Sequence, residues 1–360
     1  ICKKFTSNME CKLPITYYRL LCFMSTKIAI NGFGRIGRPT FRRILENHPD
    51  LEIVAINDLT NNETLAHLLK YDSIYGIYDK SVDYTEESLI IDDKEFLCLS
   101  EKDPANLPWK KLGVDIVLEC TGFFTKHEDA KKHIEAGAKK VVISAPSKSE
   151  EVPHFVIGVN EDKYEPENQN ILSLASCTTN CLAPIAKVIN EQFEIEKSLM
   201  TTIHSYTNSQ SLLDAPHKDL RRARAGALSM APTTTGAATA VIKTLPELEG
   251  KIDGRAIRVP TPVVSIVDFV AKVKKETDAQ EVNRILKEAS LSDNLKGILK
   301  FEKNPLVSKD YEGNSFSSII DAEFTMVQDR DLIKLFSWYD NEWGYSCRLA
   351  EFAEMVGNQI

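Results

Sequence analysis

Two cysteines four residues apart, Cys177 and Cys181, stand in the polar segment ASCTTNCLAP at residues 175–184. An apolar strand is predicted before them, at 171–175, and a helix after them, over 185–190. A thiol at such a strand-to-helix turn feels the positive end of the helix dipole, which favours the nucleophilic thiolate. Lowering a thiol pKa from about 8.5 to about 6 raises the thiolate fraction at pH 7 roughly 30-fold, a gain of ~2 kcal/mol. We therefore expect Cys177 to be a nucleophile and Cys181 a structural neighbour. From the spacing alone, two buried structural cysteines are the alternative.

The candidate for a partner base is His204, which follows the apolar run LMTTI and precedes the polar loop SYTNSQ. Catalytic groups concentrate in loops at strand ends, so His204 is expected to act as a general base, with an ordinary loop histidine as the alternative. Four other histidines lie on or beside helices expected at the surface, and no chemical role is expected for them: His48, His67, His127 and His133.

A glycine motif of the form GxGxxG is made by Gly32, Gly34 and Gly37, directly after a predicted strand and at the start of a predicted helix. Asp58 stands 21 residues beyond Gly37, at the end of the next strand. This is the context of a dinucleotide-binding turn, where the glycines let the backbone approach a pyrophosphate and the carboxylate accepts hydrogen bonds from a ribose. The same carboxylate would repel a 2′-phosphate, so NAD is favoured over NADP. A tight turn followed by an unrelated aspartate is the alternative.

A basic cluster, HKDLRRAR at 217–224, is followed closely by the hydroxyl- and glycine-containing segment APTTTG at 231–236. Arginines beside hydroxyl groups suit phosphate recognition. A solvated basic face is the alternative, and nucleic-acid binding is disfavoured by the acidic net charge of the whole chain.

The elements that must position these residues fall into two patterns. In the first, apolar strands alternate with helices, which predicts a parallel sheet covered on both faces; the strands are expected at 27–31, 52–57, 114–119 and 140–144, and the helices at 38–47 and 126–136. Beyond about residue 196, alternating apolar residues predict long strands at 199–207, 256–274, 317–327 and 332–339. One helix is expected among them, at 278–289, and a last one at 342–355. The predicted fold class is α/β, with a Rossmann dinucleotide-binding domain and an α+β catalytic domain that has a mostly antiparallel sheet.

The domain boundaries follow from these patterns. We expect a dinucleotide-binding domain at 24–176, a catalytic domain at 177–340, and a C-terminal helix within 341–360 that packs back on the first domain. The first 23 residues are basic and carry three of the eight cysteines. They are expected to be an extension outside these domains, with a degenerate organelle-targeting segment as the alternative.

The composition excludes several classes of protein. With 360 residues, 43% hydrophobic and 27% charged residues, the chain is neither disordered nor a disulfide scaffold. It has no run of about 18 apolar residues, and its net charge is −8, so no dedicated membrane or nucleic-acid partner is expected. The eight cysteines form no CxxC pair, so we expect no metal site and a reducing, cytoplasmic location.

The motifs taken together resemble those of one enzyme family. NGFGRIGR, ASCTTNCLAP, TTIHSYT, DLRRARA, PTTTGAA, RVPTP and SWYDNEWGYS occur in this order between about residue 27 and the C-terminus. This set closely resembles phosphorylating glyceraldehyde-3-phosphate dehydrogenases of the bacterial and organellar type. The resemblance implies an NAD-dependent aldehyde dehydrogenase that converts glyceraldehyde 3-phosphate, inorganic phosphate and NAD to 1,3-bisphosphoglycerate and NADH. It also implies a homotetramer whose arginine-rich loop reaches toward a neighbouring subunit's cofactor.

The resemblance implies a role for each matching residue. Cys177 would form a thiohemiacetal and then a thioester, with His204 as base. NAD would be bound by Gly32, Gly34, Arg35, Ile36, Gly37, Asp58, Lys102, Thr121 and Asn341, with Tyr345 packed nearby. The C3 phosphate of the substrate would be held by Thr207 and Arg258. The attacking phosphate would be held by Ser176, Thr178, Arg222, Thr235 and Gly236.

Three departures from the family pattern keep alternatives open. Lys102 stands where arginine is common, bulkier residues usually replace Met230, and the small Ala215 beside Pro216 leaves NADP as a disfavoured second cofactor. Erythrose-4-phosphate dehydrogenase is the enzymatic alternative. A non-catalytic NAD-binding thiol redox sensor or RNA-binding regulator is the alternative from a different class.

Overall fold

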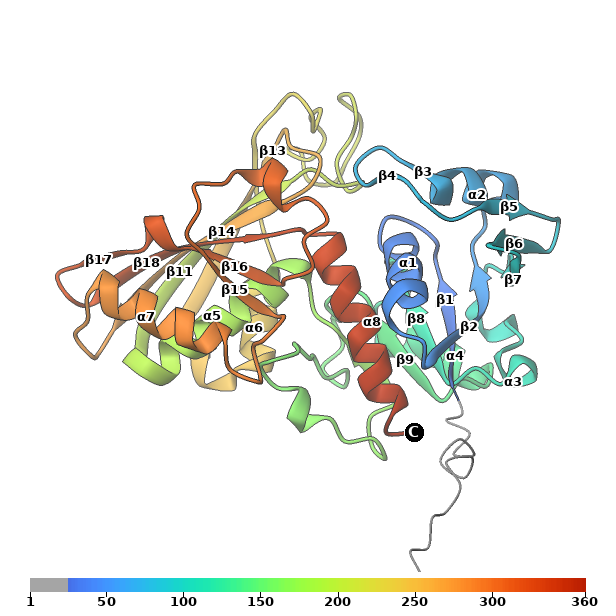
Figure 1. Ribbon diagram of the computed structural model, residues 1–360, viewed down its shortest axis with the longest axis horizontal. Coiled ribbons are helices and arrows are strands. Elements are labelled where there is room, and N and C mark those ends of the chain that lie inside the picture. The colour runs from blue at the N-terminus through green and yellow to red at the C-terminus, as the bar shows by residue number, and fades with distance from the viewer. Residues whose placement is uncertain (1–24) are drawn as a thin grey trace, which may run out of the picture.

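The computed structural model describes residues 25–360, so the extension expected at 1–23 lies outside the described residues. Two large sheets lie side by side, each with its own helices, and α8 (Trp343–Gly357) runs between them (Figure 1). Among the described residues, no helix combines the length and the apolar character needed to cross a membrane.

The first sheet has the order β10-β9-β8-β1-β2-β7-β6-β5. Its strands are β1 (Thr26–Asn31), β2 (Leu51–Asn57), β5 (Val82–Tyr84), β6 (Ser88–Ile91), β7 (Lys94–Leu99), β8 (Ile116–Glu119), β9 (Lys140–Ile143) and β10 (Ile171–Ser173). Its helices are α1 (Gly37–Asn47), α2 (Asn62–Lys70), α3 (Trp109–Leu112) and α4 (His127–Glu135), and a small hairpin joins β3 (Tyr71–Asp72) to β4 (Gly76–Ile77). Neighbouring strands run parallel, apart from β6, which is antiparallel to both β5 and β7. The predicted parallel sheet is therefore confirmed, with an antiparallel edge in addition.

Apolar side chains fill both faces of this sheet. Ile28 and Ile30 of β1 pack in a cluster with Phe41 of α1 and Phe352 of α8, while Ala29 joins a cluster on the opposite face. Successive strand residues point to opposite faces, so a strand buried on both sides needs an unbroken apolar run. This is why the sequence of β1 shows no alternation. Phe352 of α8 belongs to the same apolar cluster, so α8 packs against the first sheet.

The glycine motif lies where the chain leaves β1. Neighbours β2 and β8 flank β1 on opposite sides, which makes this strand end the switch point of the sheet. Gly32 has φ +93°, and a Cβ there would lie 2.7 Å from the backbone nitrogen of Thr121. A Cβ on Gly37 would lie 2.2 Å from the carbonyl oxygen of Gly32. Both positions therefore require glycine, because the backbone itself fills the space of a side chain.

The second sheet has the order β12-β13-β11-β14-β18-β16-β15, with β17 beside β18. Its strands are β11 (Ile195–Ser205), β12 (Ala231–Thr233), β13 (Ile252–Val259), β14 (Ser265–Val273), β15 (Leu299–Glu302), β16 (Ser318–Asp321), β17 (Met326–Gln328) and β18 (Leu332–Tyr339). The pairs β11–β13 and β15–β16 are parallel and the other pairs are antiparallel, as expected for a mostly antiparallel sheet. One face is covered by α5 (Cys177–Phe193), α6 (Ala237–Thr244) and α7 (Ala279–Ser290).

Some predicted elements in this second part are wrong. The single strand expected at 256–274 is two strands, β13 and β14, because the prolines at 260 and 262 cannot donate to a ladder and Val264 adopts φ +67°. The strand expected at 317–327 is also interrupted, between β16 and β17. Helix α6 was not expected, since its eight residues, AATAVIKT, are too few to show a helical period.

Candidate active site

Cys177 is the first residue of α5, a helix that begins eight residues earlier than the sequence predicts. The side chain of Ser176 caps the helix by accepting a hydrogen bond from the backbone N–H of Thr179 at 3.0 Å. The polar residues that follow Ser176 are therefore the first turn of the helix, and the backbone N–H groups of Cys177 and Thr178 face the thiol. The predicted location of the thiol at a helix N-terminus is confirmed, although the start of the helix is wrong.

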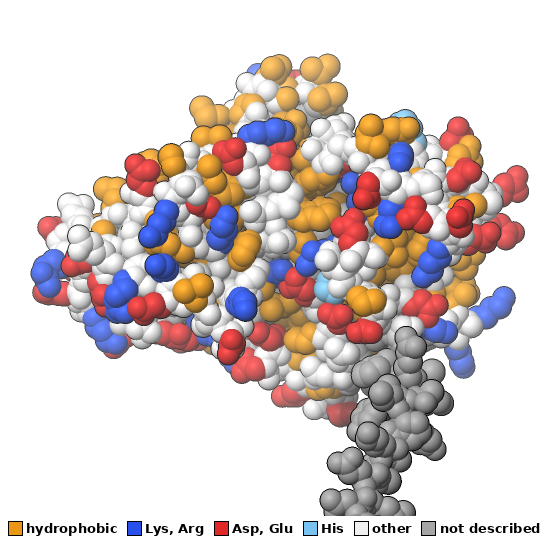
Figure 2. Space-filling model, in the orientation of Figure 1, with side chains coloured by type: hydrophobic (Ala, Val, Ile, Leu, Met, Phe, Trp, Pro, Cys, Tyr) orange, Lys and Arg blue, Asp and Glu red, His pale blue; other side chains and the backbone are white. Residues whose placement is uncertain are grey.

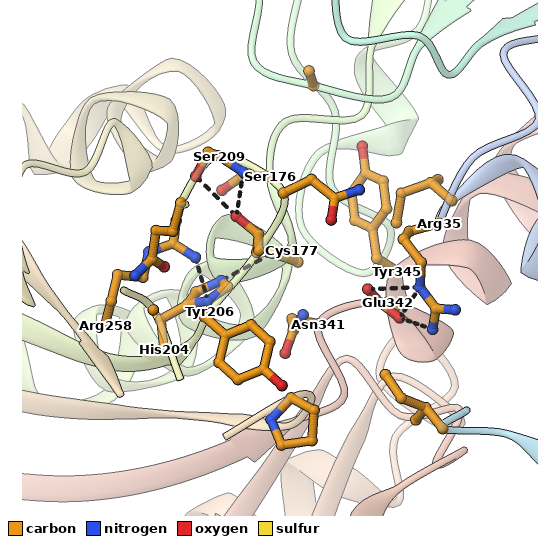
Figure 3. A pocket seen from close by; sticks show the side chains of 18 of the residues that line it. Arg35, Ser176, Cys177, His204, Tyr206, Ser209, Arg258, Asn341, Glu342 and Tyr345 are labelled. Carbon is orange, nitrogen blue, oxygen red and sulfur yellow. Dashed lines mark hydrogen bonds and ion pairs between the residues drawn. The ribbon is translucent and has the colours of Figure 1, made fainter. Parts of the chain in front are cut away.

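His204 faces Cys177 from the end of β11. Its Nε2 lies 3.6 Å from the Cys177 sulfur (Figure 3). Its Nδ1 lies 2.8 Å from the carbonyl oxygen of Ser205. When Nδ1 carries the proton and donates it to this carbonyl, Nε2 presents its lone pair to the thiol. Cys181 is fully buried and contacts Ser337 and Ser318 instead, which agrees with a structural role.

Arg258 completes this group through the register of two strands. Strands β11 and β13 are parallel neighbours in which His204 pairs with Arg258. Arg258 Nη1 donates to the Ser205 carbonyl at 2.9 Å, the same oxygen that accepts from His204 Nδ1 when this nitrogen carries the proton. The 2.8 Å approach of Nη1 to Nδ1 then brings two donors together, and both direct their protons to the Ser205 carbonyl. The guanidinium thus places a fixed positive charge beside the thiol and the imidazole.

Burial opposes a charge on either partner taken alone. It raises the pKa of the Cys177 thiol, while Arg258 and the backbone N–H of Thr178 lower it by a smaller amount. Burial and the charge of Arg258 lower the pKa of His204 to about 3. Desolvation of the sulfur outweighs the helix N-terminus, so the pKa of Cys177 moves in the opposite direction to the one that the sequence pattern favours. The thiolate needs a proton acceptor, and His204 is the one within reach.

A small cavity beside the thiol contains all the residues expected to hold the attacking phosphate. Cys177, His204 and Arg258 line it together with Ser176, Thr178, Arg222, Thr235 and Gly236. Arg222 is held in place because its Nε donates to Thr233 Oγ1 at 3.0 Å and its Nη2 donates to the Thr234 carbonyl at 3.2 Å. Two guanidinium groups and several hydroxyls on one side of a thiol form a site for an anion.

A larger cavity opens on the other side of the thiol and shares Cys177, His204, Ser176 and Arg258. Of the predicted residues it adds Thr207, Arg35, Ile36, Asn341 and Tyr345. The Asn341 Oδ1 accepts hydrogen bonds from Ser205 Oγ at 2.8 Å and Ser265 Oγ at 3.0 Å, so the NH2 group is the part of this amide that can bind a ligand. Tyr345 is fixed beneath the cavity by a hydrogen bond to the Ala175 carbonyl at 3.1 Å.

The side chain of Arg35 is not available to a cofactor. Its guanidinium pairs with Glu342 at the start of α8 (Figure 3). It also pairs with Asp72, which lies 2.5 Å away. At Arg35 and the neighbouring Ile36, it is therefore the backbone that can approach a pyrophosphate at the glycine turn. The side chain instead ties α8 to the glycine turn.

A third cavity lies over the ends of β1, β2 and β8. It gathers the remaining predicted cofactor residues Gly32, Gly34, Asp58, Lys102 and Thr121, between the exposed side chains of Leu59 and Phe123. Asp58 accepts hydrogen bonds from the backbone N–H of Phe33 at 2.8 Å and of Thr60 at 2.9 Å, which fixes the carboxylate at the rim. Gly37 lines none of these three cavities and acts through the close packing of the turn.

The glycine turn connects two of the cavities, because Gly34 lines the third cavity while Arg35 and Ile36 line the larger one. A dinucleotide laid across the turn would place one nucleoside in each cavity and its pyrophosphate at the start of α1, where backbone N–H groups favour an anion. The donor set therefore fits a dinucleotide. Among residues 25–360, no group of three or more His, Cys, Asp or Glu side chains could hold a metal ion.

Sequence reasoning missed several polar residues around these cavities. Tyr339 lies beneath the small cavity, with its hydroxyl 2.8 Å from both Thr178 Oγ1 and Thr202 Oγ1. His133 was expected on a surface helix but is fully buried, because α4 turns this side chain toward the end of β8. The signal that could have pointed there is the polar residue that ends an apolar strand, as Glu119 ends β8.

Comparisons with known proteins agree with this geometry. Residues 26–127 match the family model described as "Glyceraldehyde 3-phosphate dehydrogenase, NAD binding domain", and residues 176–341 match "Glyceraldehyde 3-phosphate dehydrogenase, C-terminal domain". The chain is 57% identical over 336 residues to a glyceraldehyde-3-phosphate dehydrogenase of Geobacillus stearothermophilus, covering 93% of this chain and 99% of the relative. It is 56% identical over 336 residues to glyceraldehyde-3-phosphate dehydrogenase 1 of Bacillus subtilis strain 168, with the same coverage. A Streptomyces coelicolor relative of the same name is 53% identical over 337 residues, covering 94% of this chain and the whole relative.

Proposed function

The chain belongs to the glyceraldehyde-3-phosphate dehydrogenase family, and from this premise we propose how its residues divide the reaction. The protein is an NAD-dependent oxidoreductase of glycolysis, acting on glyceraldehyde 3-phosphate and inorganic phosphate. The alternatives of an erythrose-4-phosphate dehydrogenase and of a non-catalytic regulator are not favoured, since the relatives bear one enzymatic name and the catalytic side chains are all present.

The NAD site is proposed to use the third cavity for the adenosine and the larger cavity for the nicotinamide. Asp58 accepts hydrogen bonds from the ribose hydroxyls, and the Asn341 NH2 group donates a hydrogen bond to the nicotinamide carboxamide. The turn at Gly32 and Gly34 has no side chain to obstruct the pyrophosphate. When bound, NAD supplies the acceptor for the substrate's hydride.

The proposed covalent chemistry begins at the Cys177 sulfur. The sulfur forms a bond to the aldehyde carbon, the thiol proton passes to His204 Nε2, and from there it reaches the former carbonyl oxygen, which gives a thiohemiacetal. His204 then takes the hydroxyl proton as the C–H bond breaks with departure of the hydride, which leaves a thioester on Cys177. An oxygen of inorganic phosphate attacks the thioester carbon, the carbon–sulfur bond breaks, and the product is an acyl phosphate.

Two phosphates are proposed to bind on opposite sides of the thiol. Thr207 and Arg258 hold the C3 phosphate of the substrate in the larger cavity. Arg222, Thr235 and the start of α5 hold the attacking phosphate in the small cavity. Because Arg258 lines both cavities, it lies where it can contact both anions.

A single observation carries this proposal. A thiol lies 3.6 Å from an imidazole, and the pair stands between two cavities that are each lined by hydroxyl groups and an arginine. The direct test is NADH formation with glyceraldehyde 3-phosphate and NAD, measured with and without inorganic phosphate. We expect phosphate-dependent turnover that exceeds turnover on erythrose 4-phosphate, and Cys177→Ser should lose nearly all of it while still binding NAD. Phosphate-independent turnover that favours the four-carbon sugar would contradict the proposal.

We also propose that the protein is a cytoplasmic homotetramer. The loop at 206–230 exposes large apolar side chains, which gather near the top of the molecule in Figure 2: Leu212, Leu213, Leu220, Leu228 and Met230. Apolar side chains gathered in this way are typical of a surface that a partner covers, and a second copy of this chain is the partner that the family implies. The five cysteines of the described residues are unpaired, which suits a reducing compartment. Analytical ultracentrifugation tests the oligomer, and a monomer at micromolar concentration would contradict it.

A further inference from the structure

Glu119 is a charged side chain buried beneath the proposed adenosine cavity, and only 1% of its surface is exposed. Its Oε1 accepts hydrogen bonds from both the backbone N–H and the hydroxyl of Thr121, the former at 2.8 Å. Its Oε2 accepts a hydrogen bond from Asn31 Nδ2 at 2.5 Å and lies 3.2 Å from His133 Nε2. Four donors thus surround one carboxylate, which is what an ionised group needs when water is excluded.

His133 is held in one tautomer from its far side. The indole Nε1 of Trp109 can only donate, and it lies 3.0 Å from His133 Nδ1. Nδ1 must therefore be the accepting nitrogen, so the proton of a neutral ring resides on Nε2 and points at Glu119. Asn31 Nδ2 lies 3.4 Å from His133 Nε2, but both nitrogens are then donors and form no hydrogen bond with each other. Asn31 Nδ2 donates to Glu119 instead.

The network continues across three strand ends. Asn31 ends β1, Asn57 ends β2 and Glu119 ends β8, and the strand register pairs Asn31 with each of the other two (Figure 1). Asn57 Nδ2 donates to Asn31 Oδ1 at 2.7 Å, and the Asn57 amide exchanges two hydrogen bonds of 2.9 Å with the backbone of Glu101. The cavity above is lined by Asn31, Asn57, Glu101 and Thr121, all members of this network or held by it.

We propose that Trp109, His133 and Glu119 are positioning residues that set the affinity of this protein for the adenosine half of NAD. They do not reach the cavity themselves but fix the polar groups that do, above all the Thr121 loop and the amide of Asn31. Polar groups that are held in their binding geometry before the ligand arrives lose less conformational entropy when the ligand binds. The inference rests on the proposed placement of the adenosine, and it concerns binding of this half of the cofactor, because the thiol and His204 line different cavities.

The test uses Glu119→Gln, which keeps the shape of the side chain. The new glutamine has one acceptor oxygen and one NH2 group where glutamate has two acceptors. The NH2 group must face either the Nε2–H of His133 or the N–H and hydroxyl of Thr121, so donor faces donor at one of these contacts. We expect the Kd for ADP-ribose, measured by calorimetry, and the KM for NAD to rise in parallel by about tenfold or more, with kcat and the KM for the aldehyde changed less than twofold. ADP-ribose carries the adenosine without the nicotinamide, so its binding reports this half of the site alone.

Three further variants separate positioning from simple loss of stability. His133→Gln can still accept from Trp109 and donate to Glu119, so it should bind ADP-ribose several-fold more tightly than His133→Leu. His48→Gln is the matched control, since His48 is also buried and pairs with a glutamate, Glu354 at 3.0 Å, but lines none of the three cavities. Equal ADP-ribose affinities in wild type and folded Glu119→Gln would overturn the inference. A wild-type protein with no NAD-dependent turnover would instead contradict the proposed function.

Discussion

Replacing His204 with asparagine tests whether the thiolate of Cys177 depends on a proton acceptor. Asparagine keeps a polar side chain of similar reach but cannot take the thiol proton. In the wild type, transfer of the proton creates a thiolate and an imidazolium about 3.6 Å apart. At an effective dielectric constant of about 20, two unit charges at that distance attract by roughly 4–5 kcal/mol. Burial of the sulfur, which raises the pKa of Cys177, is unchanged in the variant and is no longer offset by this attraction.

Two effects of His204→Asn are expected from this magnitude. The rate constant for forming the thioester should fall by about a thousandfold, which corresponds to about 4 kcal/mol. The pH midpoint for alkylation of Cys177 by iodoacetamide should move upward, because the thiolate has lost its counter-charge. Single-turnover absorbance at 340 nm measures the first effect, and alkylation rates across a pH series measure the second.

Alkylation of Cys177 is followed on the peptide that contains it by mass spectrometry, because the chain has seven other cysteines. The neighbouring Cys181 is fully buried and its pKa is raised to about 12, so it should react slowly. His67 is exposed on α2, and His67→Asn should leave both measurements at the wild-type value. If His204→Asn alkylates with the wild-type midpoint and its single-turnover rate falls less than tenfold, His204 is not the base and the proposed mechanism fails.

Further expectations concern other parts of the molecule. Asp58→Gly should lower the KM for NADP by about tenfold or more, because a fixed carboxylate at the cavity rim no longer faces the 2′-phosphate; an unchanged NAD to NADP ratio would contradict this. Arg222→Leu should raise the KM for inorganic phosphate about 10- to 100-fold, the effect of losing one charged hydrogen bond, with the KM for the aldehyde changed less than threefold. Burial lowers the pKa of His154 to about 4, so between pH 6.5 and pH 4 the unfolded chain binds a proton that the folded chain does not. The free energy of unfolding, measured with urea, should therefore decrease on the order of 3 kcal/mol as the pH falls through this window, and His154→Gln should flatten the decrease.

The chemical groups of the site could be predicted because each is encoded in a short local segment. The glycine turn needs backbone space at Gly32 and Gly37, which only a residue without a Cβ provides. Cys177 stands beside the cap of its helix, and the polar segment around it is unlike a core strand or a core helix. The strand–helix alternation around β1 reflects a sheet buried on both faces, so its apolar runs are unbroken.

The less predictable features depend on contacts between distant segments. The break between β13 and β14 occurs at a turn with two prolines inside an otherwise apolar run, where strand patterns on both sides conceal it. His133 lies on a helix with a charged outer face, and only the packing of α4 against β8 shows that this side chain turns inward.

The sequence by itself determined which residues are candidates for the chemistry and what cofactor the first domain binds, because residue type and close spacing are enough to specify a glycine turn and a helix-capped thiol. Only the tertiary structure decided how those groups behave. The parallel register of β11 and β13 places Arg258 beside His204, and burial of the thiol and the imidazole sets their protonation. Arg258 and His204 come from segments more than 50 residues apart along the chain. The electrostatic energy of a group depends on everything packed around it, and a local sequence pattern does not contain that information.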